Sequence, residues 1–341
     1  MKLLVFGGVG FIGTNVCLAA LSRGFQVIAF DNLSRRGVIE NLPILEAHKH
    51  FTFLHGDVRC AEDFHRIPKA IDVIINLAAN PAIPLSIKEP MYDFNCNVLG
   101  HIHILEYAKM HGLIPVIFAS SNKAYSDAIN EFPIIETKTR YLYKDKKLRR
   151  GFNEDTDVSG HNGYTNSPYG SGKLACEKYS REYWKHYGVP VVINRMSCIY
   201  GLYQKGVADQ GWVDHFLRVK KFGGKLTIFG SGKQVRDVLY ATDVADLYLY
   251  EAEHLEKVNG KTFNVGGGTK TGFHTSLLEL MSLIDAHFPG KKLTYSKKPW
   301  RGSDQRIYQS DISYVTKITG WKPKTTLLEG LKAMWEQYPP Q

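Results

Sequence analysis

Two residues set four apart, Tyr169 and Lys173, carry the clearest chemical signal in the sequence. They fall in a segment that is expected to form a helix at residues 167–186, so both side chains would project from one face. A free tyrosine loses its proton near pH 10, and an ammonium group one helical turn away favours the phenolate and lowers that pKa. The pair could therefore accept a proton from a hydroxyl group. The alternative is an ordinary tyrosine and lysine on a solvent-exposed helix.

Two serines are placed where they could assist this proton transfer. Ser120 and Ser121 directly follow residues 115–119, an apolar run that is expected to be a strand. Their hydroxyls could hold a substrate oxygen beside Tyr169. The alternative is that they are turn residues, which serines at a strand end usually are.

A glycine pattern at the start of the chain indicates which ligand such a site would serve. Gly7, Gly10 and Gly13 are spaced G-x-x-G-x-x-G, after an apolar strand at residues 3–6 and before a helical pattern that stops at Gly24. A turn without side chains lets backbone N–H groups approach a pyrophosphate, and the N-terminus of the helix adds partial positive charge. An ordinary tight turn is the alternative.

An acid at the end of the next strand favours a dinucleotide over a plain turn. Residues 26–30 form an apolar strand that ends in Asp31. This position lies about 20 residues beyond the glycines, where a carboxylate should hydrogen-bond the adenosine ribose. Because an acid repels a 2′-phosphate, NAD is the preferred cofactor, although Arg35 and Arg36 leave NADP open.

The ends of two later strands add cofactor candidates. Asp57 and Val58 follow an expected third strand and should lie near the adenine, and small residues at 78–79 let the backbone after a fourth strand pass close to the cofactor. Lys173 could also bind the nicotinamide ribose. The predicted cofactor-binding residues are Gly7, Gly10, Phe11, Ile12, Gly13, Asp31, Asn32, Arg35, Asp57, Val58, Leu77, Ala78, Ala79, Asn97, Tyr169 and Lys173.

The fold class expected from the alternation of strands and helices is α/β. It is a Rossmann-type doubly wound parallel sheet with a smaller C-terminal α/β lobe that holds the substrate. The Rossmann domain is expected over residues 1–200, with a polar surface insertion at about 126–165. Residues 201–341 are expected to form mainly the lobe, with some segments returning to the first domain. Further expected elements are strands at 51–55, 72–77, 189–194 and 226–229, and helices at 92–111, 212–222 and 275–287.

Composition limits the partners and the compartment. The 341 residues carry a net charge of +10, with a sequence pI of about 9.2, which suits a polyanionic ligand. The chain lacks a dense basic patch of the nucleic-acid-binding type, and the basic run at 144–150 is expected to be a solvated loop. The five cysteines lack metal-ligand spacing, so we expect no metal site. We expect the thiols to be reduced and the protein to be cytoplasmic. We expect no signal peptide and no membrane association, because the chain opens into a strand and lacks a membrane-spanning apolar run.

These motifs resemble the extended short-chain dehydrogenase/reductases that act on nucleotide sugars, and the likeness runs from Gly7 to Gly320-Trp321-Lys322-Pro323. The resemblance implies tightly bound NAD and a catalytic triad of Ser121, Tyr169 and Lys173. It also implies a homo-oligomer, a dimer or tetramer, because this family commonly packs the two long predicted helices into a dimeric four-helix bundle.

Within that family the sequence is most similar to the CDP-paratose (CDP-tyvelose) 2-epimerases. The likeness implies NAD-dependent inversion of C2 of a CDP-hexose, through transient oxidation to a 2-keto sugar and re-reduction. An NAD-dependent 4-epimerase or a net dehydrogenase of a UDP- or GDP-sugar is the alternative. An NAD-sensing binding protein would not need the triad. The stretches that carry the likeness are Asp31-Asn32-Leu33-Ser34-Arg35-Arg36-Gly37, Ser121-Asn122-Lys123-Ala124-Tyr125, Ser167-Pro168-Tyr169, Asp209-Gln210-Gly211-Trp212-Val213 and Gly232-Lys233-Gln234-Val235-Arg236-Asp237.

The pair after the triad hydroxyl argues against dehydration. The related 4,6-dehydratases carry Asp-Glu there, which supplies the acid and base that eliminate water. Here the pair is Asn122-Lys123, and an amide cannot act as that acid.

Two arginines are predicted to bind the pyrophosphate of the substrate. The guanidinium fork of Arg236 and Arg301 matches phosphate oxygens, and both match arginines that the family uses in this way. The alternative is surface salt bridges with Asp237 and Asp304. Cys198 is expected to pack around the sugar without a nucleophilic role. The predicted substrate-binding residues are Asn122, Lys123, Cys198, Thr227, Phe229, Arg236 and Arg301.

Overall fold

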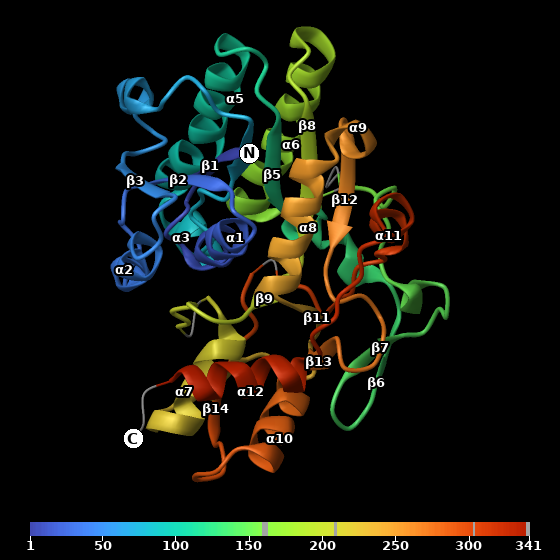
Figure 1. The fold of residues 1–341 in the computed structure, drawn as a ribbon. Coiled ribbons are helices and arrows are strands. Elements are labelled where there is room, and N and C mark those ends of the chain that lie inside the picture. Colours follow the sequence, from blue (N-terminus) through green and yellow to red (C-terminus); the bar gives the residue numbers. More distant parts are fainter. Residues whose placement is uncertain (159–162, 208–209, 303, 339–341) are drawn as a thin grey trace.

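A seven-stranded, fully parallel sheet forms the centre of the protein. The computed structural model describes residues 1–158, 163–207, 210–302 and 304–338. The sheet has the order β12-β8-β5-β4-β1-β2-β3, and its edge strands β3 and β12 lie on opposite sides of Figure 1. Its strands are β1 (Lys2–Phe6), β2 (Gln26–Asp31), β3 (Phe51–His55), β4 (Val73–Asn76), β5 (Val116–Ser121), β8 (Val191–Met196) and β12 (Lys261–Val265).

The order of the strands determines where a ligand can bind. From β1 the chain builds outward through β2 and β3, then returns to the other side of β1 with β4. At such a reversal the loops after β1 and β4 diverge, which leaves a crevice at the carboxyl edge of the sheet. The glycine turn follows β1 at this point, so the predicted Rossmann-type fold is confirmed.

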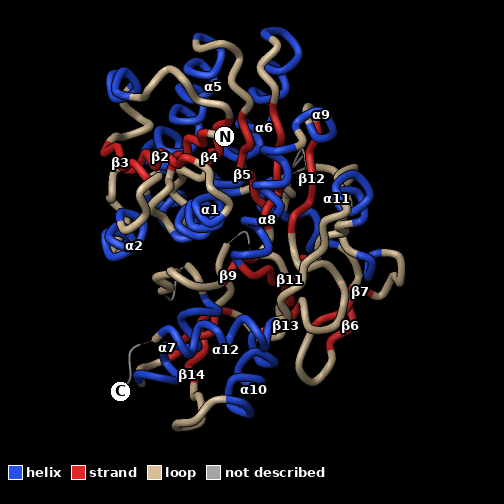
Figure 2. The backbone as a smooth tube through the Cα atoms, in the orientation of Figure 1, coloured by secondary structure: helices blue, strands red, loops and turns tan. Residues whose placement is uncertain are grey.

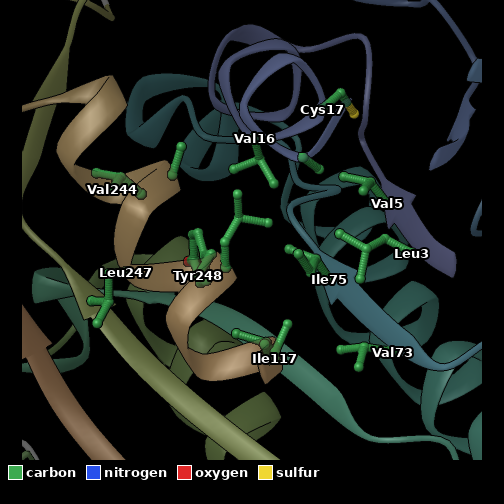
Figure 3. Packing of buried hydrophobic residues seen from close by; sticks show 14 of the residues in the cluster. Leu3, Val5, Val16, Cys17, Val73, Ile75, Ile117, Val244, Leu247 and Tyr248 are labelled. Carbon is green, nitrogen blue, oxygen red and sulfur yellow. The ribbon is translucent and has the colours of Figure 1, made fainter. Parts of the chain in front are cut away.

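Helices cover both faces of the sheet because successive residues of a buried parallel strand point to opposite sides. Leu3 and Val5 of β1 pack with α1 (Phe11–Ser22) and α8 (Ala241–Glu253), as Figure 3 shows. Leu4 and Phe6 pack on the other face with α5 (Gly100–Met110) and Tyr183 of α6 (Ser167–Tyr187).

The helix predicted at residues 92–111 is present but interrupted. Helix α4 (Pro90–Phe94) continues through one π-helical turn at Asn95–Leu99 into α5. The shorter helices around the sheet are α2 (Leu42–Glu46), α3 (Ile83–Lys88), α9 (Leu255–Val258) and α11 (Ser313–Thr319).

A smaller lobe has its own hydrophobic core, which includes Phe216, Ile228, Leu280 and Leu331. Its helices lie in the lower part of Figure 1, and Figure 2 shows strands β9 and β11 between them and the central sheet. Helix α8 and strand β12, from the same half of the chain, join the large sheet instead. The elements of the lobe are α7 (Trp212–Phe222), β9 (Cys198–Tyr200), β10 (Leu226–Phe229), β11 (Val235–Tyr240), β13 (His274–Ser276), α10 (Leu277–His287), β14 (Tyr295–Lys298), β15 (Ile307–Tyr308) and α12 (Leu327–Gln337).

The segment predicted as a surface insertion is anchored more firmly than its polar composition indicated. It forms the hairpin β6 (Ile134–Glu136) and β7 (Tyr141–Tyr143), and the ring of Phe152 stacks 6.0 Å from that of Tyr308 in a shared aromatic cluster. The basic run at 144–150 is exposed apart from the partly buried Leu148, as expected for a solvated loop. The described helices are all too short or too polar to cross a membrane.

A carboxyl group lies in the core beneath the sheet. Glu251 of α8 is fully buried, and its Oε2 accepts a hydrogen bond from Asn194 Nδ2 at 2.7 Å. Burial raises the pKa of Glu251 from its usual value near 4.5 to about 8. The other oxygens of the two side chains lack a partner among the described residues, and a protonated carboxyl could donate the second bond that this geometry leaves open.

This carboxyl makes folding stability fall as the pH rises. Between the two pKa values the unfolded chain has lost the Glu251 proton and the folded chain keeps it, so the free energy of unfolding falls by about 1.4 kcal/mol per pH unit. Glu251→Gln should remove this loss, because an amide can make both hydrogen bonds with Asn194 without ionising. Thermal melts should show the variant gaining stability over wild type between about pH 5 and about pH 8. A constant difference across that range would contradict the assignment.

Candidate active site

Two contiguous cavities lie along the carboxyl edge of the sheet. The first, of about 200 Å³, follows the ends of β1 to β4, and the second, of about 720 Å³, lies between α6 and the smaller lobe. Phe11, Ile12 and Leu77 line both cavities. A ligand in the first cavity can therefore reach a molecule in the second.

The first cavity collects nearly all the predicted cofactor-binding residues outside the catalytic helix. Asn97 is the exception, because it lies behind the wall. Its side chain accepts from Asn80 N at 2.9 Å and donates to Asp93 Oδ1 at 2.9 Å, so it shapes the loop after β4. The predicted residues that line the cavity are Gly7, Gly10, Phe11, Ile12, Gly13, Asp31, Asn32, Arg35, Asp57, Val58, Leu77, Ala78 and Ala79.

The glycine turn has no room for side chains. Gly7 has a φ of +72°, in the left-handed region, and a Cβ at Gly13 would overlap Gly7 O and the backbone of Gly8. Helix α1 begins at Phe11, and Gly10 caps it without a side-chain hydrogen bond. The first turn thus presents backbone N–H groups to the cavity, which is the cradle that a pyrophosphate needs.

Asp31 joins the glycine turn to the end of β2. Its carboxylate accepts Val9 N at 3.1 Å and Leu33 N at 2.9 Å, and burial raises its pKa. A carboxylate has about four lone-pair sites, so these backbone bonds leave acceptor capacity for a ribose hydroxyl. Arg35 lines the same cavity and hydrogen-bonds Gln210, whereas Arg36 is exposed.

The predicted adenine end is held by a second carboxylate. Asp57 Oδ2 accepts Asn32 Nδ2 at 2.9 Å and pairs with Arg59. Burial acts to raise the pKa of Asp57, but hydrogen bonds from Arg59 and Asn32 outweigh it and hold the pKa at about 2. Asp57 is therefore an anion that fixes the loop around Val58.

The second cavity contains the proposed triad. Tyr169 and Lys173 project from α6, and Ser121 ends β5 opposite them. The helix approaches the strand end closely because Gly170 lacks a side chain, and a Cβ there would overlap Lys123 O. The backbone N–H of Tyr169 donates to Ser86 Oγ at 3.2 Å, which fixes the start of the helix.

The pKa of Tyr169 is raised in the structure, whereas the sequence predicts that Lys173 lowers it. Burial raises the pKa of Tyr169 to about 12, against a hydrogen bond with Ser121 that lowers it. Lys173 Nζ lies 5.9 Å from the centre of the tyrosine ring and donates to Ala119 O at 2.8 Å. Burial lowers the pKa of Lys173 in turn. The desolvation of a phenolate therefore outweighs the neighbouring ammonium in this structure.

The far end of the second cavity is cationic. Arg236 Nη2 pairs with Asp304 Oδ1 at 2.7 Å, and Arg301 Cζ lies 3.7 Å from the centre of the Phe229 ring. The predicted alternative of a salt bridge with Asp304 is thus present for Arg236, within the cavity wall. Asp237 points elsewhere and hydrogen-bonds Ser197 and Ser310. Burial lowers the pKa of Lys123 to about 8.

Most of the predicted substrate-binding residues line this cavity. Thr227 does not, because its hydroxyl meets Ser296 Oγ at 3.3 Å on the surface of the lobe. Burial raises the pKa of the Cys198 thiol to about 12, which fits a packing role. The predicted residues on the wall are Asn122, Lys123, Cys198, Phe229, Arg236 and Arg301.

Three further residues near this site, Trp212, Gln204 and Gln305, are not among the predicted site residues. Trp212 lines the second cavity and donates its indole N–H to Cys198 Sγ at 3.1 Å, and Gln204 lines both cavities. Gln305 hydrogen-bonds Asn122 from behind. Trp212 stood within a quoted motif, whose Asp209 lies outside the described residues. Gln204 and Gln305 stand in no motif that would have singled them out.

Comparisons with known proteins agree with this site. Residues 3–266 match the NAD dependent epimerase/dehydratase family, and the chain belongs to that family. CDP-paratose 2-epimerase of Salmonella typhi is 38% identical over 344 residues, which cover 98% of each chain. The structure of Thermotoga maritima UDP-glucose 4-epimerase with UDP-glucose is 28% identical, with a TM-score of 0.79 over 98% of both chains. Thermus thermophilus UDP-glucose 4-epimerase with NAD is 26% identical, with a TM-score of 0.75 over 98% of both chains.

NAD is the cofactor of this family, and the first cavity fits it. The glycine turn and the first turn of α1 would hold the pyrophosphate, and Asp31 would hold the adenosine ribose. Asp57 and Val58 line the same cavity, and the prediction that they border the adenine places the base at their end of it.

Gly13→Ala tests this assignment. The added methyl group would collide with Gly7 O, so the turn must open and its N–H groups must leave the pyrophosphate. The purified variant should contain less than about a tenth of the wild-type NAD. Gly302→Ala is the control, because a Cβ there meets nothing within 4 Å. Full NAD content in Gly13→Ala, measured after acid release, would contradict the pyrophosphate assignment.

Proposed function

We propose that this protein is a nucleotide-sugar epimerase that inverts C2 of a CDP-hexose of the paratose and tyvelose type. The observation that carries the proposal is that Tyr169, Lys173 and Ser121 line a cavity that also holds Arg236 and Arg301 and is contiguous with the cofactor cradle. Similarity over the full length to the CDP-paratose 2-epimerase of Salmonella typhi supports the choice of sugar and base.

In this reaction Tyr169, Ser121 and Lys173 would have separate roles. Tyr169 takes the proton of the sugar 2-hydroxyl and later returns it, while Ser121 hydrogen-bonds the same oxygen. Lys173 stabilises the phenolate and binds the nicotinamide ribose. NAD, when bound, supplies the acceptor that takes up a hydride from C2 and gives it back.

The cations in the second cavity would bind the diphosphate. Arg236 and Arg301 offer planar guanidinium groups, and Arg236 would exchange its contact with Asp304 for a phosphate oxygen or share it. A sugar held only through its diphosphate can present either face at C2. The volume of about 720 Å³ leaves room for that turn.

A second candidate is the epimerisation of C4 in a UDP- or GDP-sugar. The likeness to UDP-glucose 4-epimerase of Thermotoga maritima, in complex with UDP-glucose, favours it. Both reactions use the same triad, so the position of the sugar decides between them. A net dehydrogenase would instead release NADH at each turnover, which an absorbance trace detects.

Isotope labelling of the product tests the proposed chemistry. We expect the purified enzyme, without added NAD, to interconvert two CDP-hexoses that differ only in configuration at C2. This reaction should be faster than its reaction with UDP- or GDP-sugars. Product formed in heavy water should carry no deuterium on carbon, because the hydride returns without meeting solvent. Deuterium at C2 or C3 would indicate enolisation and contradict direct oxidation, and a preference for a UDP-sugar inverted at C4 would favour the second candidate.

We also infer that a second copy of this chain covers α6 and the helical stretch from α4 to α5. Both α4 and α5 pack against α6, and these helices expose Met91, Phe94 and Tyr179, with Met91 68% exposed. A homodimer through these helices would bury these side chains, and a tetramer would add a second interface. Sedimentation at micromolar concentration should show a dimer or larger, and a monomer would contradict this.

The five free cysteines suit a reducing compartment, so we place the enzyme in the cytoplasm. Fractionation of the source cells tests this, and recovery in an extracytoplasmic fraction would contradict it.

A further inference from the structure

The hydroxyl of Ser121 has more hydrogen-bond partners than it has protons. Ser121 Oγ donates to Asn122 Oδ1 at 3.3 Å and accepts Lys123 N at 3.2 Å. Ser121 and Tyr169 line the same cavity, and hydrogen bonding with Ser121 acts to lower the pKa of Tyr169. A hydroxyl has a single donor proton, so Ser121 cannot donate to Asn122 and to a Tyr169 phenolate at the same time.

The amide of Asn122 is held in one orientation by Gln305. Asn122 Nδ2 donates to Gln305 Oε1 at 3.2 Å, and Gln305 Nε2 donates back to the backbone oxygen of Asn122 at 3.3 Å. Both side chains are buried, and Gln305 is only 1% exposed. Because the amide nitrogen of Asn122 faces Gln305, its oxygen faces Ser121.

Gln305 reaches this place from a distant part of the chain. It stands 183 residues after Asn122, next to Asp304, the partner of Arg236. Two residues later β15 begins and pairs with β11. The position of the amide is therefore fixed by the sheet of the smaller lobe, whereas Ser121 belongs to the central sheet.

We propose that Gln305 is a positioning residue, which orients Asn122 so that its amide oxygen accepts the Ser121 proton whenever Tyr169 is a neutral phenol. When Tyr169 is a phenolate, the Ser121 hydroxyl turns away from Asn122 and donates to the phenolate instead. The inference rests on the proposed function, in which Tyr169 alternates between these two forms.

In this arrangement the proton is exchanged only between the sugar hydroxyl and Tyr169. The proton that leaves the sugar hydroxyl resides on Tyr169, and the change is matched by rotation of the Ser121 O–H bond. Asn122 and Gln305 are amides that neither gain nor lose a proton, so the proton cannot pass from Ser121 to either of them. A carboxylate at position 122 would compete for the proton and would hold the Ser121 hydroxyl more strongly.

Loss of Gln305 should change the balance between the two forms of Tyr169. Without its partner, the amide of Asn122 can rotate, and the phenol form loses the acceptor that satisfies Ser121. The phenolate keeps its hydrogen bond from Ser121, so the pKa of Tyr169 should fall. The titratable groups that also act on the pKa of Tyr169 are Arg35, Asp93 and Cys176, and Lys173 Nζ lies 5.9 Å from the centre of its ring. Gln305→Leu leaves all of them in place.

The first measurement is a spectroscopic titration of holoenzyme. The ultraviolet absorbance of each protein is measured against pH, and the absorbance of the same protein carrying Tyr169→Phe is subtracted. The difference reports the ionisation of Tyr169 alone. In Gln305→Leu its pKa should lie at least about half a unit below that of wild type. In Asn122→Asp it should lie above wild type, because a carboxylate holds the Ser121 proton and repels the phenolate.

The second measurement is turnover. Gln305→Leu should lower kcat by about tenfold while KM and NAD content change less than about twofold, because Gln305 lines neither cavity. The acid limb of the pH–rate profile should move in the same direction as the titration.

Gln234→Leu is the matched control for stability. Gln234 is also a buried glutamine, 5% exposed and beside β11, and its amide donates to Phe229 O at 2.8 Å instead of to Asn122. It should lose a similar amount of thermal stability and leave the titration of Tyr169 unmoved. Equal titration shifts in both leucine variants, or none in Gln305→Leu, would overturn the positioning role. The titration needs no sugar, so a wild-type protein that converts no nucleotide sugar overturns the proposed function separately.

Discussion

A buried ion pair holds the catalytic helix to the sheet. Glu177, fully buried on α6 one turn after Lys173, accepts hydrogen bonds from Arg195 Nε at 3.0 Å and Nη2 at 2.9 Å. The same carboxylate accepts Ser120 Oγ at 2.6 Å, so the helix is joined to β5 and β8 at once. Removing either charged partner would leave an uncompensated charge in the core, at a cost of about 3–5 kcal/mol. The separation of Tyr169 and Ser121 depends on this contact, because it sets the height and rotation of α6 above the strand ends.

The same arginine connects the active site to the parts of the molecule that surround it. Arg195 Nη1 donates to the hydroxyl of Tyr125 at 3.0 Å, and that hydroxyl hydrogen-bonds Asn264 of β12. Tyr125 packs in turn with Phe152 of the insertion and Tyr308 of β15. Through these contacts the insertion, the last strand of the central sheet and the smaller lobe share one buried network. The catalytic strand end is thus fixed relative to the segment that carries Arg301, Asp304 and Gln305.

The sequence predicted the features that depend on neighbours in the chain. The glycine turn and Asp31 lie where their spacing required, and helix α7 and strand β10 have the predicted bounds, because local periodicity determines such elements. Strand β12 and helix α8 were missed. The strand begins with the polar residues Lys261 and Thr262, and the helix follows β11 without a turn residue between them.

Contacts between distant segments explain the remaining differences at the site. Asn97 was assigned to the cofactor, but the loop after β4 takes up its hydrogen bonds. Gln305 reaches Asn122 only through the pairing of β15 with β11, which has no local signature. The pKa of Tyr169 depends on how deeply the packing buries it, and no spacing of residues along the chain reports that depth.

The central claim is that Tyr169 exchanges the proton of the sugar hydroxyl with the help of Lys173. The pH–rate profiles of wild type, Tyr169→Phe, Lys173→Met and the double variant, each with its bound NAD quantified, test it most directly. The account predicts that Tyr169→Phe keeps its NAD and loses turnover by about 10²-fold or more. Lys173→Met should retain less NAD, and its activity optimum should shift to higher pH. The activation free energy lost in the double variant should be far smaller than the sum of the losses in the two single variants. Substantial activity in Tyr169→Phe, or an unchanged profile and NAD content in Lys173→Met, would contradict the account.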